Sequence, residues 1–160
     1  MLSLGKRGIM NEVIRPATLD DVEGVKELVI KFYDESLSEY KISLDMDTIK
    51  ETISNFIKNH IVIVLEKQDK LVGVIGGLVT PSIFDKNQFV AQEFVWYIDK
   101  QYRHGFAGIK LLKLFEKECK NRGANLINMI HMNNLYTESL HDFYTKNGYY
   151  KMEIHYMKGV

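Results

Sequence analysis

The chain has 160 residues, of which 46% are apolar and 26% charged, a composition typical of an ordinary globular protein. Basic and acidic residues number 21 each, and this zero net charge argues against a nucleic-acid partner. No stretch approaches the ~20 apolar residues of a membrane span, and the first residues lack the apolar run of a signal peptide. The single cysteine fits a reducing compartment, so we expect a cytoplasmic protein without a membrane partner.

The N-terminal half predicts one strand and two helices. Residues 1–10 are expected to be a poorly ordered lead-in, and residues 11–160 a single domain. Residues 13–15 form a short extended run that Pro16 ends. Thr18 then caps a helix whose apolar residues, from Val22 to Phe32, recur at helical spacing. A second helix is predicted over residues 47–58, with Asp47 as its cap.

The middle of the chain predicts three strands. Residues 61–65 are almost wholly apolar, a turn follows at 68–70, and residues 71–79 return. Glycines at 73, 76 and 77 inside the return strand indicate a bulge or the close approach of another group. After a loop at 80–88, residues 89–99 form the next strand.

The C-terminal part predicts a glycine turn at residues 103–108 and a long helix after it. Gly108, Leu111, Leu112, Phe115 and Cys119 share one face of this helix, which Gly123 ends. A strand over 126–131, a helix over 137–146 and a final strand over 148–157 complete the predicted order.

The turn at residues 103–108 is suited to holding a phosphate. A helix start has backbone N–H groups without partners and the positive end of the helix dipole. Gly105, Ala107 and Gly108 let an anion approach the backbone, and Arg103 adds a positive charge. The spacing is neither a Walker pattern nor G-x-G-x-x-G. Taken alone, the segment also fits a plain tight turn before a core helix.

Residues 97–112 resemble the acetyl-CoA motif of the GNAT superfamily of N-acetyltransferases, roughly (Q/R)-x-x-G-x-(G/A). With Arg103 at the first position, Phe106 replaces the first glycine and Gly108 is the second, and Leu111 and Leu112 match the helix leucines. The other register places Tyr102 at the arginine position. Residues 14–21 resemble the opening strand and helix of the family, and residues 143–149 resemble its Y-x-K-x-G-F segment.

The resemblance implies an α/β (α+β) fold: a mixed, mostly antiparallel sheet of six to seven strands, flanked by about four helices, with strands four and five splayed. It implies acetyl-CoA as cosubstrate and no metal. The pantetheine arm would pair with the backbone near Trp96, Tyr97 and Ile98, and a backbone N–H near Ile98 would stabilise the oxyanion. The pyrophosphate would lie on the following turn, whose predicted cofactor-binding residues are Arg103, His104, Gly105, Phe106, Ala107, Gly108 and Ile109. Asn134 and Thr137 are further predicted contacts of the cofactor.

Two residues are predicted to be catalytic. Tyr144 matches the family tyrosine that protonates the departing sulfur; the alternative is an ordinary packed tyrosine. Glu93 is the acidic residue within the fourth strand, where alternation places it on one face with Val95 and Tyr97. As a base it would take the proton of the amine; the alternative is a structural ion pair.

Other polar residues carry weaker indications. His131 and Asn133 lie near the expected cleft mouth, and Cys119 is expected to be core packing. Five side chains between the first two helices form either an acceptor wall or a solvated helix face: Tyr33, Asp34, Glu35, Glu39 and Tyr40.

The sequence therefore predicts an N-acetyltransferase that moves acetyl from acetyl-CoA directly to a primary amine on a small molecule or peptide. A homodimer is its expected assembly. Two alternatives remain: a GNAT-like domain that binds acyl-CoA without catalysis and acts through protein contacts, and a nucleotide-binding α/β protein.

Overall fold

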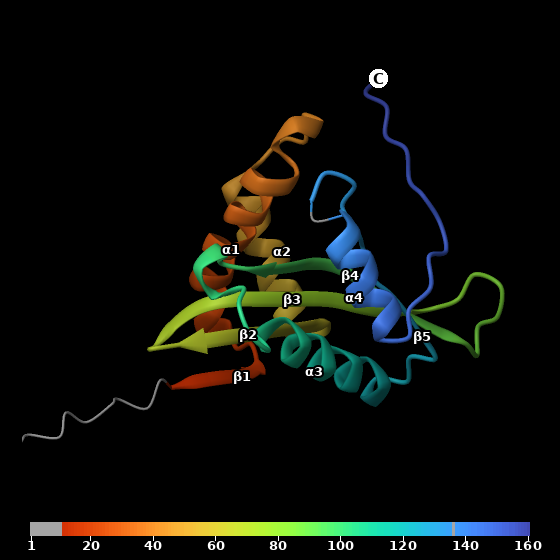
Figure 1. The fold of residues 1–160 in the computed structure, drawn as a ribbon, viewed down its shortest axis with the longest axis horizontal. Coiled ribbons are helices and arrows are strands. Elements are labelled where there is room, and N and C mark those ends of the chain that lie inside the picture. The colour runs from red at the N-terminus through yellow and green to blue at the C-terminus, as the bar shows by residue number, and fades with distance from the viewer. Residues whose placement is uncertain (1–10, 136) are drawn as a thin grey trace, which may run out of the picture. The chain divides into compact units, whose positions relative to one another are not determined.

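The computed structural model describes residues 11–135 and 137–160, and the predicted lead-in lies outside them. The described residues form two compact units, which divide after Ile130. The first unit holds a five-stranded sheet in the order β1-β2-β3-β4-β5 (Figure 1). Its strands are β1 (Glu12–Pro16), β2 (Ile61–Lys67), β3 (Lys70–Pro81), β4 (Phe89–Ile98) and β5 (Leu126–Asn128). The first four pair antiparallel, and β5 pairs parallel to β4.

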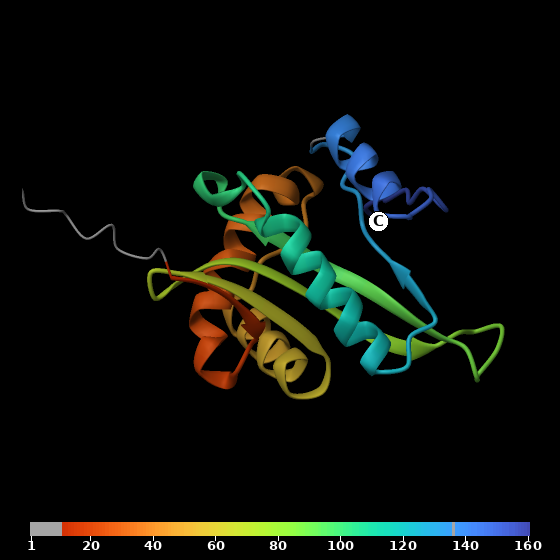
Figure 2. The same ribbon diagram turned by 60° about the horizontal axis from the view of Figure 1, so that its bottom comes forward.

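Three helices of the first unit cover the sheet: α1 (Val22–Ser36) and α2 (Met46–Asn59) on one face, and α3 (Ala107–Asn121) on the other (Figures 1 and 2). Short 3-10 turns lie at Leu19–Asp21, Ser38–Tyr40 and Lys100–Tyr102. In the second unit, α4 spans Thr137–Lys146. This is the mixed α/β class that the sequence predicts, with four α-helices and five strands in the described residues.

The regularly spaced apolar residues of α3 pack against one face of the sheet and form the core there. Leu111, Leu112, Phe115 and Cys119 are all 0% exposed, as their predicted common face requires. The helix ends in a Schellman motif: Gly123 has φ +87°, and the N–H of Ala124 donates to the carbonyl of Cys119 at 3.0 Å. The predicted glycine stop is therefore confirmed.

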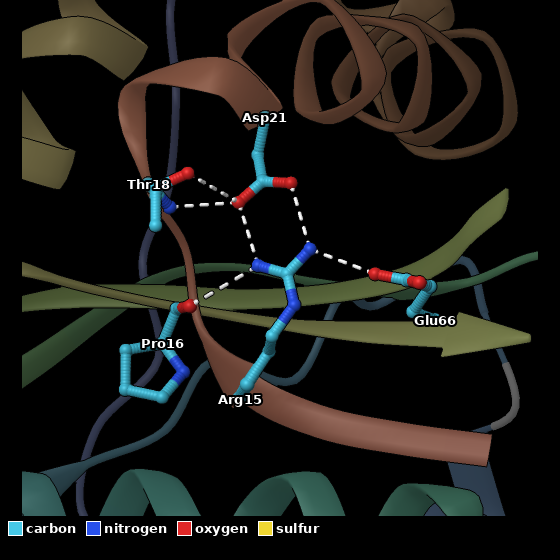
Figure 3. Close-up of polar contacts among 5 residues, drawn as sticks. All are labelled: Arg15, Pro16, Thr18, Asp21 and Glu66. Atoms are coloured by element: carbon cyan, nitrogen blue, oxygen red, sulfur yellow. Dashed lines mark hydrogen bonds and ion pairs between the residues drawn. The ribbon is translucent and has the colours of Figure 1, made fainter. Parts of the chain in front are cut away.

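Arg15 ties β1 to the start of α1 (Figure 3). Its guanidinium donates to both carboxylate oxygens of Asp21, at 2.7 and 2.9 Å, and to Glu66 on β2 at 2.7 Å. Asp21 also accepts the backbone N–H of Thr18 at 2.7 Å. The hydrogen bonds from Arg15 outweigh the opposing effect of burial and hold the pKa of Asp21 below its usual value. Thr18 is thus the N-cap of the 3-10 turn Leu19–Asp21, within a capping box. The N-cap of α1 is Asp21, so the cap predicted for this helix belongs to the turn before it.

The predicted cap of α2 and the last two predicted strands are wrong, so the described residues hold five strands instead of the six to seven expected. The cap of α2 is Asp45, whose carboxylate accepts the N–H of Thr48 at 2.8 Å, not Asp47. The strand predicted over 126–131 ends at Asn128, because its pairing with β4 stops there. The strand predicted over 148–157 is not formed: after Gly148 (φ +86°) the described residues adopt no regular structure, although apolar and polar residues alternate. Alternation makes an extended segment amphipathic, but a strand also needs a neighbour that accepts its backbone hydrogen bonds.

Candidate active site

The fourth strand carries a β-bulge at the centre of the candidate site. Gly76 pairs with Val95 and Gly77 with Glu93, so Phe94 is the extra residue. A Cβ on Gly77 would come within 2.4 Å of the carbonyl oxygen of Gln92, so the close approach that this glycine predicts is confirmed.

The bulge reverses which residues of β4 share a face. Ala91 packs in the same core as Trp96 and Ile98, whereas Val95 and Tyr97 pack in the opposite core. Glu93, two residues after Ala91, therefore lies away from Val95 and Tyr97. The prediction that these three share a face is wrong, because regular alternation fails at an inserted residue.

Strands β4 and β5 pair over a short distance and then part. Their ladder joins Val90 to Leu126, Ala91 to Ile127 and Gln92 to Asn128. The side-chain amide of Asn128 donates to that of Gln92 at 3.4 Å where the ladder ends. Because β4 continues to Ile98, its edge beyond this point diverges from β5, as the predicted splay requires.

Glu93 lies at the point of divergence with its carboxyl group inside the protein. The residue is 3% exposed, and its Oε2 accepts the backbone N–H of Ile130 at 2.9 Å. Burial raises the pKa of Glu93 to about 8, although the hydrogen bond from Ile130 acts in the opposite direction. The carboxyl group is therefore mostly protonated at neutral pH.

The turn before α3, at residues 103–108, has exposed backbone at Gly105. Gly105 has φ +84°, and a Cβ there would meet nothing within 4 Å, so the turn is open on that side. Phe106 is 76% exposed and Ala107 is buried. Gly108 faces the core side of β4, since its Cβ would lie 3.7 Å from Trp96 and 3.9 Å from Ile98. The first-turn N–H groups of α3 thus lie close to the end of β4, where an anion can be held.

Arg103 is held by the protein itself. Its Nε donates to the carbonyl of Ile98 at 2.6 Å and its Nη2 to Glu35 at 2.8 Å, while its guanidinium carbon lies 5.1 Å from the ring centre of Tyr97. The Tyr97 hydroxyl donates to the other oxygen of Glu35 at 2.7 Å. Burial opposes ionisation of Glu35, but the hydrogen bonds from Arg103 and Tyr97 outweigh it and lower its pKa. Burial, aided by Glu35, raises the pKa of Tyr97.

Helix α1 makes a second contact with the segment between β4 and α3. Lys31, one turn before Glu35, donates to Asp99 at 2.5 Å. Two members of the predicted acceptor wall therefore bind groups of the protein itself. Glu35 accepts hydrogen bonds from Arg103 and Tyr97. The hydroxyl of Tyr33 donates to the carbonyl of Ile42 at 2.5 Å. The sequence did not predict the contact between Glu35 of α1 and Arg103 of the turn, because the residues around position 35 contain no pattern that indicates a partner so distant in the chain.

The second unit contains the predicted acid. Tyr144 is 8% exposed and packs near His131 and Tyr149, with ring centres 6.4 and 5.5 Å away. Burial, aided by the charges of His141 and Lys151, lowers the pKa of His131, which favours its neutral form. Asn133 and Asn134 are exposed; α4 begins at Thr137, whose side chain lies outside the described structure.

The remaining candidates fall into ordinary environments. His104 is an exposed loop residue. Burial raises the pKa of Cys119 to about 12, so this thiol is core packing, as expected. Among the described residues, no cluster of histidine, cysteine or acidic side chains is arranged to hold a metal, and no helix is long and apolar enough to cross a bilayer.

The chain is similar in fold to several solved structures of acetyltransferases. An acetyltransferase of Trypanosoma brucei is 15% identical, with a TM-score of 0.73 over 94% of this chain and 100% of the other. An aminoglycoside acetyltransferase from an uncultured soil metagenomic sample, in complex with sisomicin, is 14% identical, with a TM-score of 0.73 over 93% and 96%. A predicted acetyltransferase of Clostridium acetobutylicum with acetyl-CoA is 12% identical, with a TM-score of 0.72 over 93% and 96%. These identities establish a common fold.

No curated protein matches the chain in sequence. The model of the acetyltransferase (GNAT) family, however, matches residues 25–149, which include the bulged strand, the glycine turn and Tyr144. The chain therefore belongs to the GNAT acetyltransferase family.

Proposed function

We propose that this protein transfers an acetyl group from acetyl-CoA directly to a primary amine. The observation that carries the proposal is the glycine turn and first turn of α3 beside the diverging end of β4, with Gly108 against Trp96 and Ile98. Coenzyme A has a diphosphate and an arm with two amides. A helix N-terminus suits the diphosphate, and an open strand edge suits the amides.

In the turn at residues 103–108, the backbone N–H groups are better placed to bind the cosubstrate than the side chain of Arg103 is. Gly105 leaves the peptide groups of the turn uncovered, whereas Arg103 donates to Glu35 and to the Ile98 carbonyl. The backbone N–H groups of residues 104–109 would therefore hold the diphosphate. Arg103 would shape the turn.

The reaction forms one C–N bond and breaks one C–S bond. The amine nitrogen attacks the thioester carbonyl, the amine loses a proton to solvent water, and the sulfur leaves as a thiolate that needs a proton. A backbone N–H of the β4 edge would stabilise the oxyanion, and the phenol of Tyr144 would protonate the sulfur.

CoA release in the presence of an amine panel tests this function. The panel should contain an aminoglycoside, because one structural relative binds sisomicin, together with a polyamine and peptides with free N-termini. We expect Tyr144→Phe to lower kcat by about 100-fold, the usual scale of general acid catalysis, with the Kd for CoA unchanged. Tyr156→Phe is the matched control, since Tyr156 is 92% exposed in the same unit.

Calorimetry separates the alternatives. Tight binding of CoA without turnover of any amine would favour the acyl-CoA-binding module. Binding of ATP but not of CoA would overturn the proposal in favour of a nucleotide-binding protein.

A further inference from the structure

The ladder between β4 and β5 ends at Asn128, so the backbone N–H of Ile130 does not donate to β4 as it could in a longer ladder. In the register of these strands, the residue opposite Ile130 would be Phe94. Phe94 is the inserted residue of the bulge, and the β4–β5 ladder ends before it, at Gln92 and Asn128. The N–H of Ile130 instead donates to the carboxyl group of Glu93 at 2.9 Å. A side chain thus takes the place of the missing strand contact.

Two neighbouring amides complete this junction. The side chain of Gln92 donates to the backbone carbonyl of Glu93 at 3.1 Å, and Asn128 donates to Gln92 at 3.4 Å. Gln92, Glu93 and Asn128 therefore link β4 to the chain that leaves β5. The Glu93 side chain spans the distance between the β4 backbone and the N–H of Ile130.

We infer that Glu93 is a positioning residue, which holds the backbone of Ile130 away from β4 and keeps the β4 edge from Phe94 to Ile98 accessible to the acyl-CoA arm. The inference rests on the proposed function for the identity of the ligand. It assigns Glu93 a role that needs a hydrogen-bond acceptor and no negative charge, in contrast to the predicted base, which must accept a proton from the amine. A buried carboxyl group that is neutral at pH 7 suits this role.

A pair of substitutions of similar size separates the two roles. Glu93→Gln keeps an oxygen that can accept the Ile130 N–H but cannot serve as a base. Glu93→Met fills the same space without an acceptor. For each variant we would measure hydrogen exchange at the Ile130 amide, the Kd for CoA, and the kcat and KM for acetyl-CoA with any amine that is turned over.

For Glu93→Gln we expect protection of the Ile130 amide, the Kd for CoA and kcat all to lie within about threefold of wild type. For Glu93→Met we expect the Ile130 amide to lose protection and the Kd and KM for the cosubstrate to rise about tenfold or more. Loss in Glu93→Met together with retention in Glu93→Gln is the pattern that a general packing role would not produce, since both side chains fill the same space.

Three results would overturn the inference. In one, Glu93→Gln binds CoA normally but turns over at least about 100-fold more slowly than wild type, which would make Glu93 the base. Another is normal CoA binding by Glu93→Met. The third is rapid exchange of the Ile130 amide in the wild type, a measurement that remains available if Glu93→Met does not fold. Because this exchange needs no ligand, a wild type that binds no CoA would refute the proposed function separately.

Discussion

Glu93 links the stability of the protein to pH in the direction opposite to that of most carboxylates. Its pKa is about 8 in the folded chain, against a usual value of 4.5. Between these values the folded protein keeps a proton that the unfolded chain releases. The contribution of Glu93 is therefore complete below about pH 4.5 and is lost as pH rises towards 8, at up to ~1.4 kcal/mol per pH unit.

Denaturant unfolding of wild type and Glu93→Gln between pH 5 and 9 measures this linkage. Since glutamine does not titrate, we expect the stability of the variant relative to wild type to increase as pH rises through this range, and to level off above about pH 8. A difference that stays constant across the range would show that Glu93 has an ordinary pKa in the folded protein.

At the scale of elements, α1 and the turn before α3 are coupled by the ion pair of Glu35 and Arg103. These side chains are 18% and 24% exposed, so the pair is only partly screened by solvent. We expect a double-mutant cycle of Glu35→Ala and Arg103→Ala to give a coupling energy of about 1 kcal/mol in unfolding experiments. The exposed pair of Glu23 and Lys50 is the control, for which we expect no measurable coupling.

The same variants show what Arg103 does for the cosubstrate. If Arg103 shapes the turn through Glu35, both single variants weaken CoA binding by a similar factor and the double variant is little worse. A loss confined to Arg103→Ala would instead mean that the guanidinium contacts phosphate directly, as the sequence motif implies.

Local chemistry made most of these elements predictable. The apolar face of α3, its glycine stop and the hairpin of β2 and β3 follow from spacing and turn residues, and Gly77 indicated the close approach that the structure shows. The site is harder to predict because its key contacts join distant residues. Glu93 meets Ile130, and Glu35 meets Arg103, yet neither pair shares a local pattern. The bulge at Phe94 also changes the face of every later residue in β4, which alternation alone does not anticipate.

At the scale of the whole molecule, backbone pairing is distributed unevenly along the chain. Ile63, Val64, Val72 and Val74 of β2 and β3 are 0% exposed, and both strands have a hydrogen-bonded neighbour on each side. Residues 149–160 have no regular structure, and Tyr150 and Tyr156 are 79% and 92% exposed. The two regions should therefore differ widely in their protection from exchange with solvent.

Hydrogen exchange detected by mass spectrometry tests this contrast on the full chain. We expect peptides covering β2 and β3 to remain protected for hours and peptides covering residues 150–157 to exchange within seconds, since amides outside a hydrogen-bonded ladder open at little cost in free energy. The loop at residues 82–88, which lies between β3 and β4 and outside their ladder, is an internal comparison. Slow exchange at 150–157 that persists on dilution would mean that the alternating segment pairs with a strand edge within its own chain, as the sequence pattern predicts. Slow exchange that disappears on dilution would place that edge on a second copy of the chain.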